Sequence, residues 1–244
     1  MTVTWEELGW EPLAGGVGRV RLPVWDCTAG LVLGKGSALL VDAGSSLEEG
    51  ALLRAQAREF AGGPVTLLAL THPHFDHVFG AARFPEAEVF AAEGSYAVFD
   101  DERARAELCA DAVANGLQAQ AADEAVAALP RRPGREVSGR LALALDGGPE
   151  VLLANVGPGH TAHDLAVVVR GDRPVVFCGD LVEESGEPQA GPDAVPSHWP
   201  AALDRLLELG GEDALYVPGH GAVVDAAFVR AQRDALAEHF GVSG

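Results

Sequence analysis

The sequence predicts an α/β or α+β fold, and three observations support this. The chain has 244 residues, 48% hydrophobic and 22% charged, which is ordinary for a globular domain. Short apolar runs bounded by Gly and Pro alternate with stretches whose apolar residues have helical spacing. No long linker and no repeating period divides the sequence. We therefore expect one domain over residues 1–244, with a helical insertion at about 94–129.

The N-terminal part is expected to form a β-α-β arrangement after a β-rich start. β-like stretches separated by Gly-containing turns lie at 17–25, 29–33 and 38–42. A helix should start within residues 45–49, because Ser45 and Ser46 offer a hydroxyl cap and two Glu residues lie in the first turn. Helical spacing continues to Gly62. The short apolar run at 65–70 then predicts a buried strand.

The remaining elements follow the same local signals. After a strand at 88–92, the Ala-, Glu- and Asp-rich stretch from about 94 to 129 contains good helix formers. Further strands are expected at 136–145, 150–155, 165–170 and 174–178. A helix should begin near His198, followed by a strand at 214–217 and a last helix near 225–239.

A cluster of histidines directly follows the strand at 65–70. Residues 72–77 read His-Pro-His-Phe-Asp-His, which places three imidazoles and one carboxylate within six positions. The carboxyl ends of strands are where open α/β sheets bind ligands. Imidazole and carboxylate groups suit a borderline-soft divalent metal such as zinc. The cluster therefore predicts a metal site.

The other histidines repeat this arrangement. Among only eight histidines, His160 and His220 sit in the Gly-rich turns 157–161 and 218–221, each after an apolar segment. Asp180 closes a further apolar strand. The order of apolar strand, tight turn and metal-competent side chain thus recurs, which scattered core or surface histidines would not produce.

These pieces resemble, in order and local context, the metallo-β-lactamase superfamily of metallohydrolases. The matching motifs are VDAG (41–44), THPHFDHVFG (71–80), GPGHT (157–161), FCGD (177–180) and PGHG (218–221). The resemblance implies a four-layered αβ/βα sandwich. It also implies two divalent ions, one held by His72, His74 and His160, the second by Asp76, His77 and His220, with Asp180 bridging them. Zinc is favoured, with iron and manganese as alternatives.

The resemblance further implies hydrolysis, with Asp76 and Asp180 as catalytic carboxylates and a hydroxide held between the ions as nucleophile. A structural zinc site is the alternative, but such sites are closed, four-coordinate and Cys-rich. Seven oxygen and nitrogen ligands suit two open ions better. The three cysteines are widely spaced, odd in number and without a CxxC pattern, so no disulfide framework is expected.

Supporting roles are expected for polar residues next to the ligands. By resemblance, Asp42 orients the histidine loop through hydrogen bonds. Thr71 and Thr161, each beside a ligand histidine, could do the same. Ordinary turn and loop roles are the alternative for all three residues.

Selectivity should come from segments that overhang the strand ends, namely the helical stretch 94–129 and the acidic loop 181–199. Pocket contacts are expected from Phe99, His163, Leu181, Glu183 and Trp199. For His163, a hydrogen-bonding role within its own loop is favoured. The alternative is that the helices only cover the core and the loop is solvated.

The all-His/Asp ligand set looks most like glyoxalase II and lactonase-type members, which implies a small ester, thioester, lactone or amide substrate. Zinc β-lactamases of one main type carry Cys where Asp180 stands and Lys three residues later. Glu183 stands there in this chain and would repel a carboxylate. An iron-dependent oxidoreductase resembling persulfide dioxygenases, a zinc β-lactamase and an inactive binding protein remain alternatives.

The charge and the N-terminus bear on partners and location. A net charge of −19 and a pI of about 4.6 disfavour nucleic acid and anionic membranes as partners. The first ten residues have no basic start and no apolar signal region, and no apolar stretch approaches a bilayer span. We expect a cytoplasmic protein with a small-molecule substrate. The oligomeric state is not predicted.

Overall fold

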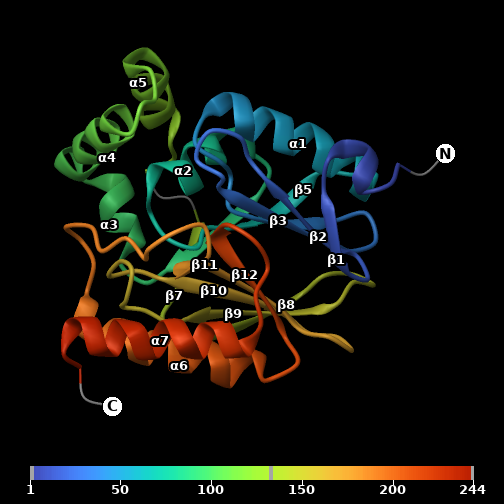
Figure 1. Ribbon diagram of the computed structural model, residues 1–244. Helices are drawn as coiled ribbons and strands as arrows, with labels where there is room; N and C mark the ends of the chain where they lie inside the picture. The colour runs from blue at the N-terminus through green and yellow to red at the C-terminus, as the bar shows by residue number, and fades with distance from the viewer. Residues whose placement is uncertain (1–2, 132–133, 243–244) are drawn as a thin grey trace.

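The computed structural model describes residues 3–131 and 134–242 (Figure 1). Residues 1 and 2 of the N-terminal stretch considered above lie outside this range. Two β-sheets face each other, one of seven and one of five strands, and helices cover their outer faces. This arrangement confirms the four-layered sandwich that the resemblance implied.

The seven-stranded sheet is built from the N-terminal half, and its strands follow one another in chain order. They are β1 (Glu11–Ala14), β2 (Val17–Arg21), β3 (Thr28–Leu33), β4 (Ala38–Val41), β5 (Val65–Ala69), β6 (Glu88–Ala92) and β7 (Gly134–Val137). Pairing is antiparallel from β1 to β4 and parallel from β4 to β7. The helical segments of this half are η1 (Glu6–Leu8), α1 (Leu47–Ala61), α2 (Phe75–Val78), η2 (Phe79–Arg83), α3 (Ser95–Asp100), α4 (Glu102–Ala114) and α5 (Ala119–Ala128).

The five-stranded sheet has the order β12-β11-β10-β9-β8. Its strands are β8 (Arg140–Ala144), β9 (Glu150–Asn155), β10 (Leu165–Val169), β11 (Val175–Glu183) and β12 (Leu215–His220). Within this sheet β11 and β12 pair parallel, and the other neighbouring strands pair antiparallel. The helical segments of this half are η3 (Pro196–His198), α6 (Trp199–Gly210) and α7 (Ala226–Phe240). None of the helices in the described ranges is long and apolar enough to cross a membrane.

The core has three layers, which explains the continuous apolar runs of the central strands. Leu39 and Val41 of β4 pack between the sheets against Val167 and Phe177. Leu40, on the other face of β4, packs under α1 instead. A strand buried on both faces has no polar face, so its sequence does not alternate.

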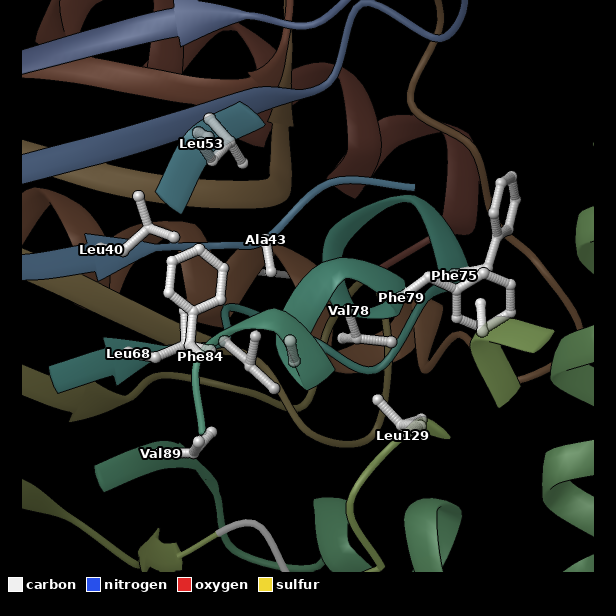
Figure 2. Packing of buried hydrophobic residues seen from close by; sticks show 14 of the residues in the cluster. Leu40, Ala43, Leu53, Leu68, Phe75, Val78, Phe79, Phe84, Val89 and Leu129 are labelled. Carbon is white, nitrogen blue, oxygen red and sulfur yellow. The ribbon is translucent and has the colours of Figure 1, made fainter. Parts of the chain in front are cut away.

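The histidine segment is fixed by apolar side chains on its own short helix. Phe75 and Val78 of α2 lie in the cluster that also contains Leu40 and Leu68 of the sheet (Figure 2). Phe79 continues this packing in η2. Because these side chains point into the core, Asp76 and His77 between them are directed to the opposite side, toward the metal-competent residues described below.

Several boundaries differ from the sequence expectations. The strand expected at 136–145 is two strands, β7 and β8, because the chain leaves one sheet and enters the other near Gly139. The strand expected at 17–25 ends at Arg21, and β1 was not expected. Asp180 and His220 lie within β11 and β12 rather than in turns after them, at a register irregularity between the two strands.

Candidate metal centre

All seven metal-competent side chains meet at one edge of the two sheets. Segment 72–77 follows β5, and His160 lies between β9 and β10. Asp180 and His220 come from neighbouring strands, β11 and β12. Among the described residues, three groups of ligand atoms have all their members within 4.8 Å of one another. Two of them include Asp180, namely His72, His74, His160 with Asp180, and His77, His220 with Asp180. The third consists of Cys27, Asp76 and His77.

The first group surrounds one carboxylate oxygen. Asp180 Oδ2 lies 3.6 Å from His72 Nε2 and 3.5 Å from His160 Nε2. His74 Nδ1 completes the group, 3.1 Å from His160 Nε2. These are the three histidines that the resemblance assigned to one ion.

The second group lies on the other side of the same carboxylate. Asp180 Oδ1 is 3.2 Å from His77 Nε2, and Asp180 Oδ2 is 3.3 Å from His220 Nε2. Asp76 Oδ2 approaches the same two rings, at 3.5 Å from His77 Nε2 and 3.3 Å from His220 Nε2. Asp180 therefore lies between the two triads, where a bridging ligand would stand.

Each of the five histidines has a hydrogen-bond acceptor at its outer ring nitrogen. His77 Nδ1 donates to Asp42 Oδ2 at 2.9 Å, and His74 Nε2 donates to Asp193 Oδ2 at 3.1 Å. The acceptors for the other three are Thr71 Oγ1 for His72 (3.0 Å), Gln189 O for His160 (3.1 Å) and Trp25 O for His220 (2.7 Å). Such bonds make the outer nitrogen the donor, so the inner nitrogens of all five rings face the centre, as metal-binding histidines require.

Asp42 holds the histidine segment in place through hydrogen bonds. Its carboxylate accepts hydrogen bonds from Thr71 N and Thr71 Oγ1, both at 2.8 Å, besides the one from His77. It is buried and has a positive φ of 60°, which Asp tolerates better than most residues. The structure thus places Asp42 and Thr71 in the orienting positions expected for them.

Two of the histidines are kept neutral by burial. Burial lowers the pKa of His72 well below its usual value, and the nearby His77 lowers it further. Burial lowers the pKa of His160 to about 4, although Asp180 opposes the change. A neutral imidazole is the form that coordinates a metal.

The carboxylates give the rest of the site a strong affinity for positive charge. Burial disfavours the cationic form of His220, but the Asp180 carboxylate outweighs it and raises the pKa of His220 to about 12. Burial likewise opposes ionisation of Asp180, yet the neighbouring histidines hold its pKa well below the usual range. Divalent cations that bind here would have to displace protons.

The donor set fits divalent ions. His74 Nδ1 and His160 Nε2 face each other with lone pairs at 3.1 Å, an arrangement that a shared cation or proton stabilises. Within the described residues, His72 Nε2 and Asp180 Oδ1 are buried and have no hydrogen-bond partner. Buried polar atoms without partners are rare in proteins, and those lining a ring of N and O donors indicate a cation site.

One glycine is required by this packing. A Cβ atom built on Gly219 would collide with Asp180 Oδ1. The glycine before His220 therefore lets the β12 backbone pass directly against the Asp180 carboxylate.

A cavity of about 430 Å³ opens onto the centre. Its walls include Trp25 from the loop after β2 and Asp111 and Asn115 from α4. Glu183 at the end of β11 and Glu187 in the loop after it line the other side. The helical stretch and the acidic loop thus both border the cavity, as hypothesised, and Glu183 is the expected pocket residue that lies in its wall.

Four of the expected pocket contacts are wrong. Phe99 and Leu181 are core residues, each 1% exposed. Trp199 is fully buried behind the His160 ring, with ring centroids 5.4 Å apart, and its Nε1 donates to Leu181 O. His163 is not among the residues that line the cavity, and its Nδ1 donates at 2.8 Å to the carbonyl oxygen of Glu93, which lies between β6 and α3 and not in the loop of His163 as expected. Phe99, Leu181 and Trp199 were expected in the pocket because they are apolar, but apolar residues are equally typical of the core.

Thr161 acts on its turn and not on a ligand ring. Its backbone N–H and its hydroxyl both donate to the buried carboxylate of Asp164, the hydroxyl at 2.7 Å. Burial raises the pKa of Asp164 to about 7, although these hydrogen bonds oppose the change. The Asp164–Thr161 contacts hold the turn that carries His160.

Several residues at the site were not found from the sequence. Asp193 contributes its carboxylate, and Gln189 and Trp25 contribute backbone carbonyl groups. All three lie in loops, and no local sequence motif indicates that they reach the histidines. Cys27 Sγ lies 3.1 Å from Asp76 O and 3.7 Å from His77 Nδ1. Burial raises the pKa of the Cys27 thiol to about 12, so it packs beside the ligands as a neutral group.

Comparisons with known proteins agree with this geometry. The family model described as the metallo-beta-lactamase superfamily matches residues 22–220. The comparison with curated proteins returns no match.

Solved structures show the same fold. A metallo-beta-lactamase from Pontibacter korlensis is 22% identical and has a TM-score of 0.69, with 93% of this chain and 97% of that chain covered. The metallo-beta-lactamase FIM-1 from Pseudomonas aeruginosa, in its mono-zinc form, is 20% identical with a TM-score of 0.68 and 96% of both chains covered. A metallo-beta-lactamase from Hirschia baltica is 17% identical with a TM-score of 0.66, covering 93% of this chain and 96% of that chain.

Proposed function

Because the chain belongs to the metallo-beta-lactamase superfamily, we propose that it is a dinuclear metallohydrolase that acts on a small ester, thioester, lactone or amide. The ions would be zinc, since the donors are imidazole nitrogens and carboxylate oxygens. His72, His74 and His160 would hold one ion. Asp76, His77 and His220 would hold the other, with Asp180 between the two.

The observation that carries this proposal is the orientation of the five histidines. Every outer ring nitrogen has an acceptor, from Asp42 to the Trp25 carbonyl, and every inner nitrogen faces the Asp180 carboxylate or a neighbouring ligand. A core or surface role for these residues would need no such convergence. Structural zinc sites, which are closed and usually rich in Cys, also differ from this open set beside a cavity.

Bound divalent ions supply Lewis acidity, which lowers the pKa of a water molecule and offsets negative charge on the attacked carbonyl group. Within the protein, Asp180 would neutralise part of the ionic charge and hold the two triads at their spacing. Asp76, which lines the cavity, would accept a proton from the attacking water. The Asp42 and Asp193 carboxylates keep His77 and His74 in the required tautomers.

The cavity also bears on the substrate. Among the described residues, no Lys or Arg lines it, whereas Asp111, Glu183 and Glu187 do. A substrate carboxylate would therefore meet acids instead of a basic partner. This favours neutral or cationic substrates and argues against β-lactams, whose carboxylate needs a cation.

Metal analysis with a substrate panel tests the proposal. Protein purified without added metal should contain close to two zinc ions per chain, and it should hydrolyse at least one ester, thioester, lactone or amide in a chelator-sensitive way. One iron per chain with no zinc and no hydrolysis would instead support the oxidoreductase alternative. Two bound ions without turnover on any substrate class would support a binding protein.

A further inference from the structure

A second cavity of about 490 Å³ adjoins the metal cavity. The two cavities share His74, Asp111 and Gly191 in their walls. The second one lies between the helices α3 and α4 on one side and the loop around Asp193 on the other. In Figure 1 this loop is part of the orange segment between β11 and α6, which passes next to α3 and α4. A group bound to the metals could thus extend past His74 into this space.

The inner wall of the second cavity is apolar. Val98 of α3 and Ala104 and Leu108 of α4 line it, together with Pro73 and Pro192. The two helices therefore present aliphatic side chains here, although α4 as a whole is rich in charged residues. Hydrolysis at the metal centre does not require such a wall, but an apolar arm of the substrate would gain free energy by burying itself against it.

The rim of the cavity is negatively charged, and one of its acids lacks a cationic partner. Glu107 is paired with Arg103 at 2.8 Å, and Asp193 is bonded to His74. Asp111 accepts only an amide hydrogen bond, from Asn115 Nδ2 at 3.1 Å, and has no Lys, Arg or His within ion-pair distance in the described residues. No Lys or Arg from those residues lines either cavity.

We propose that the second cavity binds an apolar, positively charged arm of the substrate, with its cationic group beside Asp111 and its methylene groups against Val98, Ala104 and Leu108. This inference rests on the proposed hydrolase function and specifies its substrate class. The apolar wall selects for an aliphatic arm, and the unpaired acid selects for the sign of its charge. Asp111 would be a specificity-determining residue, since it belongs to both cavities and bears no role at the metals.

Matched substrates test the charge preference. Three acyl esters with chains of equal length would end in a trimethylammonium group, an isosteric tert-butyl group and a carboxylate. We expect kcat/KM to be about three- to tenfold higher for the cationic than for the neutral ester, and lowest for the anionic one. Asp111→Asn should remove most of the cationic preference, measured as the ratio of kcat/KM for the cationic ester to kcat/KM for the neutral ester in the same protein. Glu124→Gln removes the same charge from α5, outside both cavities, and should change nothing.

The apolar wall is tested by filling it. Ala104→Phe should lower kcat/KM for a long-chain ester at least about fivefold and leave an acetyl ester unchanged. Ala110→Phe adds the same ring to the exposed face of α4 and is the control for effects on folding. Equal losses for both variants, or for both chain lengths, would contradict a role for this wall in binding.

A binding measurement separates this inference from the hydrolase proposal. Calorimetric titration of the metal-loaded protein with hexyltrimethylammonium should show binding that is weakened in Asp111→Asn, while heptanoate should not bind. If esters are hydrolysed with no preference for charge and hexyltrimethylammonium does not bind, this inference is wrong and the hydrolase proposal stands. If no ester, thioester, lactone or amide is hydrolysed but the cation binds in an Asp111-dependent way, the cavity is assigned correctly and the hydrolase proposal fails.

Discussion

Oδ2 of Asp193 lies 3.1 Å from Nε2 of His74, although 119 positions separate the two residues in the chain. Burial disfavours the charged form of His74, but the hydrogen bond and the charge of Asp193 outweigh it and raise the pKa of His74. The contact joins the loop before α6 to the histidine segment after β5. The orientation of one metal-competent ring therefore depends on the position of a distant loop.

Replacing this carboxylate should weaken metal binding. Asp193→Ala leaves the outer nitrogen of His74 without its acceptor, so the ring is free to adopt the other tautomer. Loss of an orienting hydrogen bond of this kind lowers metal affinity by about ten- to a hundredfold. Competition with a chromophoric chelator measures it, and Asp172→Ala, at an exposed position between β10 and β11, serves as the control. Unchanged affinity for both ions would show that the contact has no orienting role.

Asp42 should affect both stability and metal content. Three donors converge on its carboxylate, from Thr71 N, Thr71 Oγ1 and His77 Nδ1. In Asp42→Asn one of these donors must face an amide N–H₂ group, which costs about 1–3 kcal/mol at a buried site. Denaturant unfolding in the presence of a chelator measures the stability, and elemental analysis measures the metal content. Asp172→Asn, in an exposed turn, should match the parent in both experiments.

The proposed function makes Asp180 the ligand that bridges two ions, so it should be the most sensitive residue for turnover. Asp180→Ala should abolish hydrolysis and leave most of the fold intact. Asp180→Asn should also lose at least about a thousandfold in kcat, because the amide cannot offset the charge of two cations. Steady-state kinetics on a verified substrate, with circular dichroism to check the fold, tests this. Near-parental kcat in either variant would rule out the bridging assignment.

Asp164 should make stability depend on pH. Its pKa rises from about 4 in the unfolded chain to about 7 in the folded protein because it is buried. Between these values the folded state binds more protons than the unfolded state, so the contribution of Asp164 is full below about pH 4 and is lost as the pH rises to about 7. Such a rise in pKa corresponds to about 4 kcal/mol as an order of magnitude.

The variant Asp164→Asn isolates this effect. It has no carboxyl proton to lose, so the free energy of unfolding of the parent, relative to that of the variant, should decrease as the pH rises between about 4 and 7. Chemical denaturation of both proteins in a chelator at several pH values measures the difference. Parallel pH curves for the two proteins would show that Asp164 is ionised throughout.

Local patterns were sufficient for most of the fold and for the metal-competent residues. The strands at 88–92 and 150–155 and the helix capped by Ser46 appear where the sequence placed them, because hydrophobic period and capping residues act over a few positions. The grouping of the histidines into two sets came from the resemblance of the five motifs to the metallo-β-lactamase superfamily, not from local patterns. The pattern of apolar residues does not show where the chain passes from one sheet to the other. The sequence therefore predicts one strand at 136–145, where the structure has β7 and β8 in different sheets.

By itself, the sequence determined the elements, the seven metal-competent side chains and their local turns. Tertiary structure alone decided which atoms face the centre, because Asp193, Gln189 and Trp25 reach the histidines from loops that the fold brings together. It also decided that Phe99, Leu181 and Trp199 are core residues and that Asp111 lines the cavity. The physical reason is that side-chain identity records local propensity and chemistry, whereas burial and hydrogen-bond partners depend on contacts between distant segments.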